Sequence, residues 1–275
     1  MVTPSPNPSR KREGELIDLA TIAPALLSGA LIGLILGLVG GGGSILAVPL
    51  LVYVVGVSSP HRAIGTAAVA VALNAASGLV GHHRAGTVKW PCALVFAGTG
   101  AVGAAFGAEL GKATDGARLL ALFGGMMVVV GLTMLRKRRS PENPDVRLRA
   151  ATAAHLLPRL VPAGLVVGGL AGFFGIGGGF LIVPALILAT GMPLRNAIGT
   201  SLVVVTTLGL TTAASYALSG AVDWWLVAVL LVGGGVGSLA GIALGKRLSG
   251  KRRLMEVGFA AVVIAVGLYI VARGL

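Results

Sequence analysis

Apolar stretches of membrane-spanning length recur along almost the whole chain of 275 residues. A helix needs roughly 20 apolar residues to cross the hydrocarbon core of a bilayer. Hydrophobic residues make up 55% of the chain and charged residues only 11%, whereas a soluble domain carries about a quarter charged residues. The predicted fold class is therefore an all-α polytopic membrane protein.

The basic residues lie where a membrane protein needs them. Lys and Arg number 22 against nine Asp and Glu, so the net charge is +13. Most of this charge falls between the apolar stretches, in clusters such as residues 136–139 and 251–253. Clusters of this kind set the orientation of membrane proteins. Aromatic residues, at 5%, are too few for a base-stacking surface. The lipid bilayer is thus a predicted partner, and nucleic acid is not.

The chain contains two copies of one unit. When Gly33 is aligned with Gly168, the glycines and a proline that follow in the first copy fall on the same residue types in the second. After a deletion of one residue, the sequence Ala-Ile-Gly-Thr at 63–66 falls on the same sequence at 197–200. The alignment extends from Gly33 to Lys112 in the first copy, which is a strong sign of internal duplication.

The duplication divides the chain into four segments. Residues 1–15, rich in Pro, Ser and charge, are predicted to be a disordered tail. The first transmembrane repeat spans 16–135, a basic polar linker spans 136–159, and the second repeat spans 160–275. Each repeat has a first element broken by glycines and three further helices. The predicted helical segments are 22–39, 45–57, 62–81, 90–111 and 117–135, then 161–174, 180–190, 196–218, 224–245 and 253–272.

Glycines recur every three or four residues along the third helix of each repeat. Such stripes let helices approach closely in lipid, so packing is the preferred interpretation. The stripes consist of Gly100, Gly103, Gly107 and Gly111 in the first repeat and Gly233, Gly237, Gly241 and Gly245 in the second.

A glycine-rich run interrupts the first element of each repeat. The run is Gly-Gly-Gly-Gly-Ser at 40–44 in the first repeat and Gly-Ile-Gly-Gly-Gly at 175–179 in the second. Glycine breaks helices because it loses the most backbone entropy on folding. Irregular backbone at membrane depth is tolerated only where protein or water covers it. Interrupted segments at matching positions of two repeats therefore point to the binding site of a transporter.

The positive-inside rule bears on whether each broken element crosses the membrane or turns back. Crossing gives eight spans, with 13 Lys and Arg inside and nine outside. A re-entrant hairpin leaves both large basic loops inside, with 15 basic residues inside and seven outside. The re-entrant alternative is preferred. It makes the linker 136–159 cytoplasmic and the repeats inverted, although the basic cluster at 10–12 opposes it.

The glycine break, the apolar run that ends in proline and the sequence Ala-Ile-Gly-Thr occur twice. This combination resembles the sulfite exporter TauE/SafE family of bacterial membrane permeases, and the resemblance covers nearly the whole chain past residue 20. It implies a permease of the bacterial plasma (inner) membrane with about eight helical segments. It also implies sulfite, sulfoacetate or another small organosulfur anion as the substrate. Ile176 within the second run departs from the four consecutive glycines of the first.

The predicted transport path begins at the breaks. A helix that restarts after a break points unpaired N–H groups and a positive dipole end at the middle of the membrane, where they favour an anion. Hydroxyl and amide groups on the second helix of each repeat can supply further donors, or can instead bond to the helix carbonyls. The candidate substrate-binding residues are Gly40, Gly41, Gly42, Gly43, Ser44, Thr66, Asn74, Gly175, Gly177, Gly178, Gly179, Thr200 and Thr207.

Three charged residues are secondary candidates. Arg62 and Arg195 stand at matching entry positions, where anchoring at the membrane interface is the competing interpretation. Glu109 is one of two carboxylates inside predicted helices, with an interfacial role or a proton relay as its alternatives. Since buried acids are scarce, export down the membrane potential is favoured over proton-coupled uptake.

The sequence thus predicts a secondary transporter that exports a small anion, and a homo-oligomer is compatible with it. The alternatives are an uptake permease for organosulfur anions and a non-transporting scaffold subunit. No enzyme is expected, because all four His lie in loops or near helix ends. Neither glycine run is followed by the Lys-Ser or Lys-Thr of a P-loop. No cofactor and no metal site are expected.

Overall fold

A computed structural model describes residues 8–39, 41–135, 150–175, 177, 179–247 and 252–274. All regular elements in these ranges are helical, which confirms the all-α fold class. The elements, in chain order, are α1 (Pro8–Val39), the 3₁₀ helix η1 (Gly41–Leu46), α2 (Ala47–Tyr53), α3 (Pro60–Arg84), α4 (Trp90–Ala113), α5 (Gly116–Leu135), α6 (Ala150–Phe174), α7 (Gly179–Thr190), α8 (Leu194–Leu218), α9 (Trp224–Arg247) and α10 (Arg252–Gly274).

Six helices in the described part of the chain are long and apolar enough to cross a membrane, namely α3, α4, α5, α6, α8 and α9. Shorter apolar helical segments lie at Ile22–Gly37, Gly43–Tyr53, Gly179–Thr190 and Val257–Arg273. Two of these short segments, Gly43–Tyr53 and Gly179–Thr190, follow the glycine break of their repeat. This set of lengths is that of a multi-pass membrane protein with two interrupted elements.

Two helices begin earlier than predicted. Helix α1 begins at Pro8, within the predicted disordered tail, and α6 begins at Ala150, within the predicted linker. Proline suits the first turn of a helix, and the Arg, Lys and Glu that follow Pro8 are good helix formers, as are the alanines after Ala150. Residues 1–7 and 136–149 lie outside the described residues. The boundaries of the two repeats stay a prediction.

Local sequence fixes several helix ends. Ser59, before the proline that opens α3, accepts a hydrogen bond from the backbone N–H of Arg62. Asp115 accepts two backbone hydrogen bonds at the start of α5. Helices α3 and α8 both end just before a glycine in the left-handed region, Gly86 with φ of 64° and Gly220 with φ of 68°.

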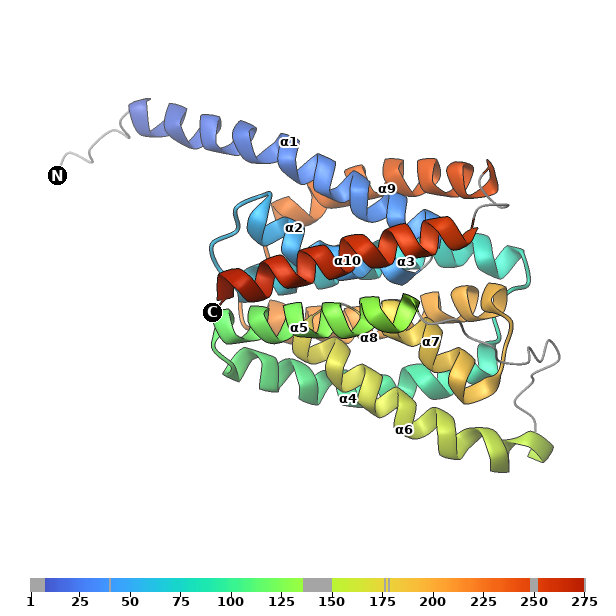
Figure 1. The fold of residues 1–275 in the computed structure, drawn as a ribbon. Coiled ribbons are helices and arrows are strands. Elements are labelled where there is room, and N and C mark those ends of the chain that lie inside the picture. The colour runs from blue at the N-terminus through green and yellow to red at the C-terminus, as the bar shows by residue number, and fades with distance from the viewer. Residues whose placement is uncertain are drawn as a thin grey trace.

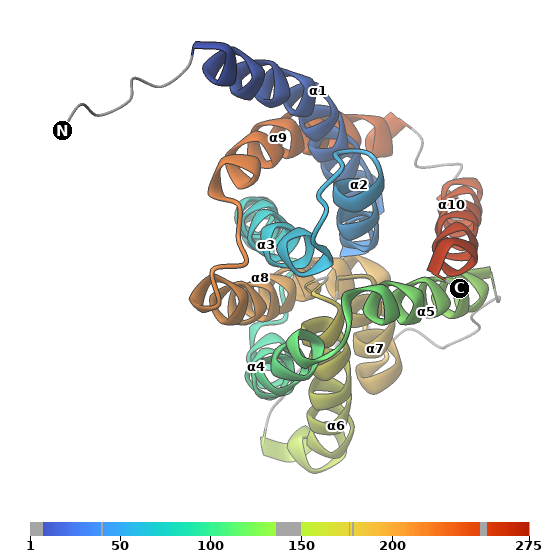
Figure 2. The ribbon, with the colours of Figure 1, turned by 90° about the vertical axis from the view of Figure 1, so that its left-hand side faces the viewer.

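The most extensive helix packing joins elements of different predicted repeats. Helix α1 runs alongside α9, with Gly33 against Gly234, and α4 runs alongside α6, with Gly107 against Gly169. A Cβ on Gly33 or Gly107 would overlap the facing backbone. The glycine stripe of α4 and that of α9 as far as Gly241 are therefore packing surfaces, as predicted, and each faces the first helix of the other repeat (Figure 2). For Gly245 only the helical backbone is described.

Helices α3 and α8 form the central pair, which lies between the α1–α9 and α4–α6 pairs (Figure 2). The two helices run antiparallel, because Gly65 near the start of α3 lies against Ala221 beyond the end of α8, whereas Gly78 lies against Leu202. Helices α5 and α10 are also antiparallel and pack beside this core. In these two pairs, the helices that the duplication matches run in opposite directions, as the predicted inverted repeats would require.

The bundle has two ends (Figure 1). We call them the α3-start end, where α3 begins and α8 ends, and the α8-start end, where α8 begins and α3 ends. Helices α1 and α3 run in the same direction, so the element α1–η1–α2 returns to the end at which α1 begins, a path that agrees with a re-entrant element. Helices α5 and α9 both end at the α8-start end.

Glycine packing gives the first testable expectation. Gly107→Ala should lower the free energy of unfolding by about 1–3 kcal/mol, because the added methyl group overpacks the α4–α6 contact. Gly98→Ala is the matched control on the same helix, since a Cβ there meets nothing within 4 Å. Thermal unfolding in detergent measures both variants. Equal stability of the two would contradict the close contact.

The shared end of α5 and α9 gives a second expectation. Single cysteines at Ser140 and Ser249, in a Cys92→Ser background, should react with an impermeant thiol reagent only from the cytoplasmic side. A cysteine at Ser58, between α2 and α3 at the α3-start end, should react only from the other side. Opposite accessibility of positions 140 and 249 would contradict this topology and restore eight plain spans.

Candidate functional site

The second break is a turn whose shape requires glycine. Gly175 and Gly177 have φ of 66° and 64°, in the left-handed region that side chains disfavour. A Cβ on Gly175 would also overlap Ile64 of α3. Helix α7 begins at Gly179, where the restart was predicted. Ile176 and Gly178 lie outside the described residues.

Gly177 lies at the middle of the central pair. A Cβ there would be 3.4 Å from Val71 of α3 and 3.6 Å from Val205 of α8. These two valines are counterparts in the alignment that matches Ala-Ile-Gly-Thr with its second copy. Both are buried. The second break therefore meets the bundle where the matched helices cross, with its backbone open to close approach because Gly177 has no side chain.

The first break has a different local structure. Residues Gly41–Leu46 form the 3₁₀ helix η1, and the α-helix restarts at Ala47 and not at Ser44-Ile45 as predicted. Gly43 packs tightly against α1, where a Cβ would lie 2.7 Å from the carbonyl oxygen of Ile32. Gly40 lies outside the described residues, and for Gly41 and Gly42 only the helical backbone is described.

The first break contacts the helix that follows the second break. Element η1 packs against α7, and both pack against α8. Gly43, Ser44, Gly177 and Gly179 are all buried, so protein covers the irregular backbone as membrane depth requires. The structure thus brings the first break beside α7, which begins at the candidate Gly179 of the other repeat.

Thr66 and Thr200 make matched contacts at opposite ends of the central pair. Thr66 Oγ1 accepts a hydrogen bond of 3.0 Å from the backbone N–H of Asp223, just before α9. Thr200 Oγ1 accepts one of 3.0 Å from the backbone N–H of Lys89, just before α4. Each hydroxyl therefore ties the start of one repeat's second helix to the other repeat. A role in substrate binding stays a prediction.

The glycine of the duplicated Ala-Ile-Gly-Thr sequence explains how these contacts form. A Cβ on Gly65 would overlap the carbonyl oxygen of Ala221, and one on Gly199 would lie 2.5 Å from Thr87 Oγ1. Glycine lets the loop of the other repeat lie directly on the helix, and the following threonine then reaches its backbone. The duplicated sequence thus joins the two repeats at two places, and we call these contacts, at Gly65-Thr66 and at Gly199-Thr200, the clamps.

Asn74 and Thr207 lie nearer the middle of the helices. Asn74 of α3 is 6% exposed, and its amide packs against Gly234 of α9, whose added Cβ would lie 2.5 Å from Nδ2. Thr207 of α8 donates its hydroxyl hydrogen to the carbonyl of Val203 at 3.0 Å. That bond is the back-bonding alternative considered for the hydroxyl stripe.

The two arginine candidates are exposed at the ends of the bundle. Arg62 lies 3.9 Å from the Asp223 carboxylate, at the α3-start end. Arg195 opens α8 at the other end. These positions suit interfacial anchors.

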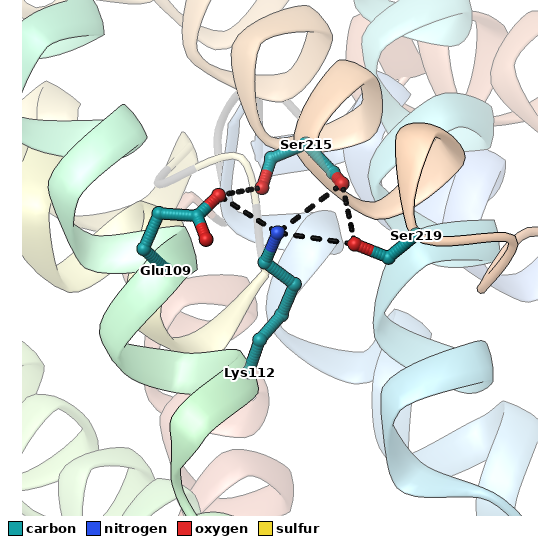
Figure 3. Close-up of polar contacts among 4 residues, drawn as sticks. All are labelled: Glu109, Lys112, Ser215 and Ser219. Atoms are coloured by element: carbon teal, nitrogen blue, oxygen red, sulfur yellow. Dashed lines mark hydrogen bonds and ion pairs between the residues drawn. The ribbon is translucent and has the colours of Figure 1, made fainter.

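Glu109 belongs to a polar cluster that joins α4 to α8 at the α3-start end (Figure 3). Its Oε1 lies 2.7 Å from Lys112 Nζ and accepts a hydrogen bond of 2.8 Å from Ser215 Oγ. Lys112 also donates to Ser219 Oγ at 3.1 Å. The Glu109 side chain is 67% exposed, so the geometry supports the interfacial alternative over a buried proton relay.

Sequence reasoning missed three groups of this region. Thr212 and Tyr216 of α8 are fully buried, yet neither hydroxyl has a hydrogen-bond partner within the described structure, and the same holds for Nδ1 of His61 in α3. The available signal was the spacing of Thr212 and Tyr216, one helical turn apart, which places them on one helix face. The candidates predicted on this helix, Thr200 and Thr207, lie on a different face.

The chain is similar in sequence to a known family and to several named proteins. The sulfite exporter TauE/SafE family matches residues 25–270. A "Probable membrane transporter protein" of Xylella fastidiosa (strain 9a5c) is 48% identical, covering 90% of this chain and 93% of its own. YunE and YdhB of Bacillus subtilis (strain 168), both named probable membrane transporter proteins, are 27% and 30% identical and cover 90% and 77% of this chain and 96% and 85% of their own. No solved structure matches.

The fold and these relatives define a multi-pass membrane transporter of the bacterial plasma membrane. The chain belongs to the sulfite exporter TauE/SafE family. The family resemblance seen in the duplicated sequence is confirmed over nearly the whole chain. The relatives are named as transporters and not as enzymes.

The clamps give a third expectation. Thr66→Val and Thr200→Val should each lower the free energy of unfolding by about 1 kcal/mol or more, because a partly buried backbone N–H loses its acceptor. Thr206→Val is the control, since that hydroxyl bonds only to its own helix, at the carbonyl of Leu202. Thermal unfolding and anion flux are measured together. Lost flux at unchanged stability would instead assign the two threonines to the substrate.

Proposed function

We propose that this transporter exports a small anion, such as sulfite or an organosulfonate, by alternating access around the two glycine breaks. The observation that carries the proposal is the position of Gly177, between the matched valines Val71 and Val205 of the central antiparallel pair. A site on the axis that relates two inverted repeats can be exposed to either side by exchanging the conformations of the repeats.

The chemistry of the breaks supports an anionic substrate. Helix α7 restarts at Gly179 directly after the break, and the first N–H groups of a helix have no partner within it. These groups and the helix dipole favour negative charge. Because glycine has no side chain, a ligand can approach this backbone closely. The family description, sulfite exporter, supports an oxyanion of sulfur as that ligand.

The placement of charge supports export. No carboxylate is buried among the described residues, and Glu109 is already paired with Lys112. Uptake of an anion against a negative-inside potential needs a coupling cation, whereas export gains about 2.3 kcal/mol per charge for each 100 mV. The α8-start end, at which α5 and α9 end next to the basic stretches 136–149 and 246–253, is then the cytoplasmic end.

Flux in proteoliposomes tests this function. Sulfite, sulfate, thiosulfate, sulfoacetate and taurine are compared at a defined membrane potential and pH gradient. We expect potential-driven flux of at least one sulfur oxyanion, with little effect of the pH gradient once substrate ionisation is fixed. Absence of flux for every anion would contradict the proposal and favour the scaffold alternative.

A substitution at the break gives the fourth expectation. Gly177→Val should abolish flux, because the new side chain fills the space between Val71 and Val205. Gly86→Val is the matched control, since Gly86 has the same φ of 64° but a Cβ there meets nothing within 4 Å. Both variants carry similar backbone strain, so only the first should lose transport. Full flux in Gly177→Val would show that the second break is not part of the transport path.

A further inference from the structure

Three buried polar atoms at the α3-start end of the central pair have no hydrogen-bond partner in the described structure. They are Nδ1 of His61, Oγ1 of Thr212 and the hydroxyl oxygen of Tyr216. Thr212 and Tyr216 are each 0% exposed. Buried polar groups in proteins are nearly always paired, and an unpaired group is a place where water or a ligand belongs.

The three groups belong to one small region. Thr212 and Tyr216 are one turn apart on the same face of α8, and a long side chain in a helix leans toward the preceding turn. The Tyr216 side chain is thus expected to lean toward Thr212. The His61 ring, from the start of α3, stacks beside Tyr216 with ring centroids 6.4 Å apart and an interplanar angle of 30°.

Thr212 differs from its neighbours on α8. The hydroxyls of Thr206, Thr207 and Thr211 all donate to the carbonyl four residues earlier, at 2.8–3.0 Å. Threonine in a membrane helix commonly makes this bond because water is absent. The Thr212 hydroxyl makes no such bond, so its hydrogen stays available for a ligand.

The same face of α8 leads to the central break. Val205, which flanks Gly177, precedes Thr212 by seven residues and Tyr216 by eleven, and both intervals return to the same side of an α-helix. At 1.5 Å per residue, Thr212 lies about 10 Å along the helix from Val205 and Tyr216 about 16 Å. The three groups therefore lie between the break and the α3-start end, along the same helix face.

The charged groups around this region are already paired. Ser215, next to Tyr216 in sequence, donates to Glu109, and that carboxylate pairs with Lys112. Arg62, next to His61, lies 3.9 Å from Asp223. The unpaired groups can each donate a hydrogen bond, His61 through the tautomer protonated on Nδ1. A cluster of donors without a buried carboxylate suits a ligand that only accepts hydrogen bonds.

We propose that His61, Thr212 and Tyr216 form an anion subsite that holds a sulfite or sulfonate group between the central breaks and the α3-start end. The proposal rests on the proposed function and adds a second anion-binding site to the transport path. The subsite is closed in this structure, because Thr212 and Tyr216 are fully buried. A substrate reaches it from the breaks and leaves when the α3-start end opens.

The fifth expectation tests the hydroxyls by isosteric removal. Tyr216→Phe and Thr212→Val should each raise KM for sulfite flux about tenfold or more, because a hydrogen bond to a charged group is lost. Neither variant should lower the melting temperature, since the deleted hydroxyls have no protein partner. Thr211→Val is the control, because its hydroxyl already bonds to the Thr207 carbonyl, and its KM should equal that of the parent.

The outcomes separate this proposal from the proposed function. Parent-like KM in both variants, with normal flux, would overturn the subsite and leave the exporter intact. A lower melting temperature in either variant would show that the hydroxyl has a structural role and would also overturn it. If the parent itself transports no anion, the subsite is tested by measuring sulfite binding through the melting temperature. Thermal stabilisation by sulfite in the parent that is lost in Tyr216→Phe and kept in Thr211→Val would support the subsite, and equal responses would reject it.

Discussion

Direct contact between helix backbones at glycine is the interaction on which this structure depends. Inside a bilayer, apolar side chains gain little by leaving lipid for protein, so helices associate through close packing. Gly33 meets Gly234, and Gly107 meets Gly169, so closely that a methyl group would overlap the facing backbone. Both contacts join the first helix of one repeat to the third helix of the other. The two repeats are therefore interlocked and do not form separate halves.

This interlocking fixes the position of the breaks. Helices α1 and α6 pack against α9 and α4, and each is followed by a glycine break. The first break thus meets α7 beside α3 and α8, where protein covers the irregular backbone. The threonine clamps at Thr66 and Thr200 hold the two ends of the same central pair. A transporter needs such a frame, because the site must stay in place while the ends open in turn.

The sequence predicted the helices, the breaks and the packing stripes, because these depend on composition and on spacing along one helix. It could not predict which helix each stripe faces, since periodicity defines a face but not its partner. The duplicated threonines looked like ligands for the same reason. Their bonds to Asp223 and Lys89 join distant parts of the chain and follow no local pattern. Conversely, Thr212 and Tyr216 drew no attention because a hydroxyl without a partner is visible only in three dimensions.

The central claim is that the anion crosses at the paired breaks. Anomalous diffraction from crystals grown with selenite, an analogue of sulfite that carries a strong anomalous scatterer, tests it most directly. We expect a selenium peak against the backbone near Gly177, between Val71 and Val205. Selenium peaks found only at the lipid-facing surface or at the basic loops, in a protein that transports selenite, would contradict it.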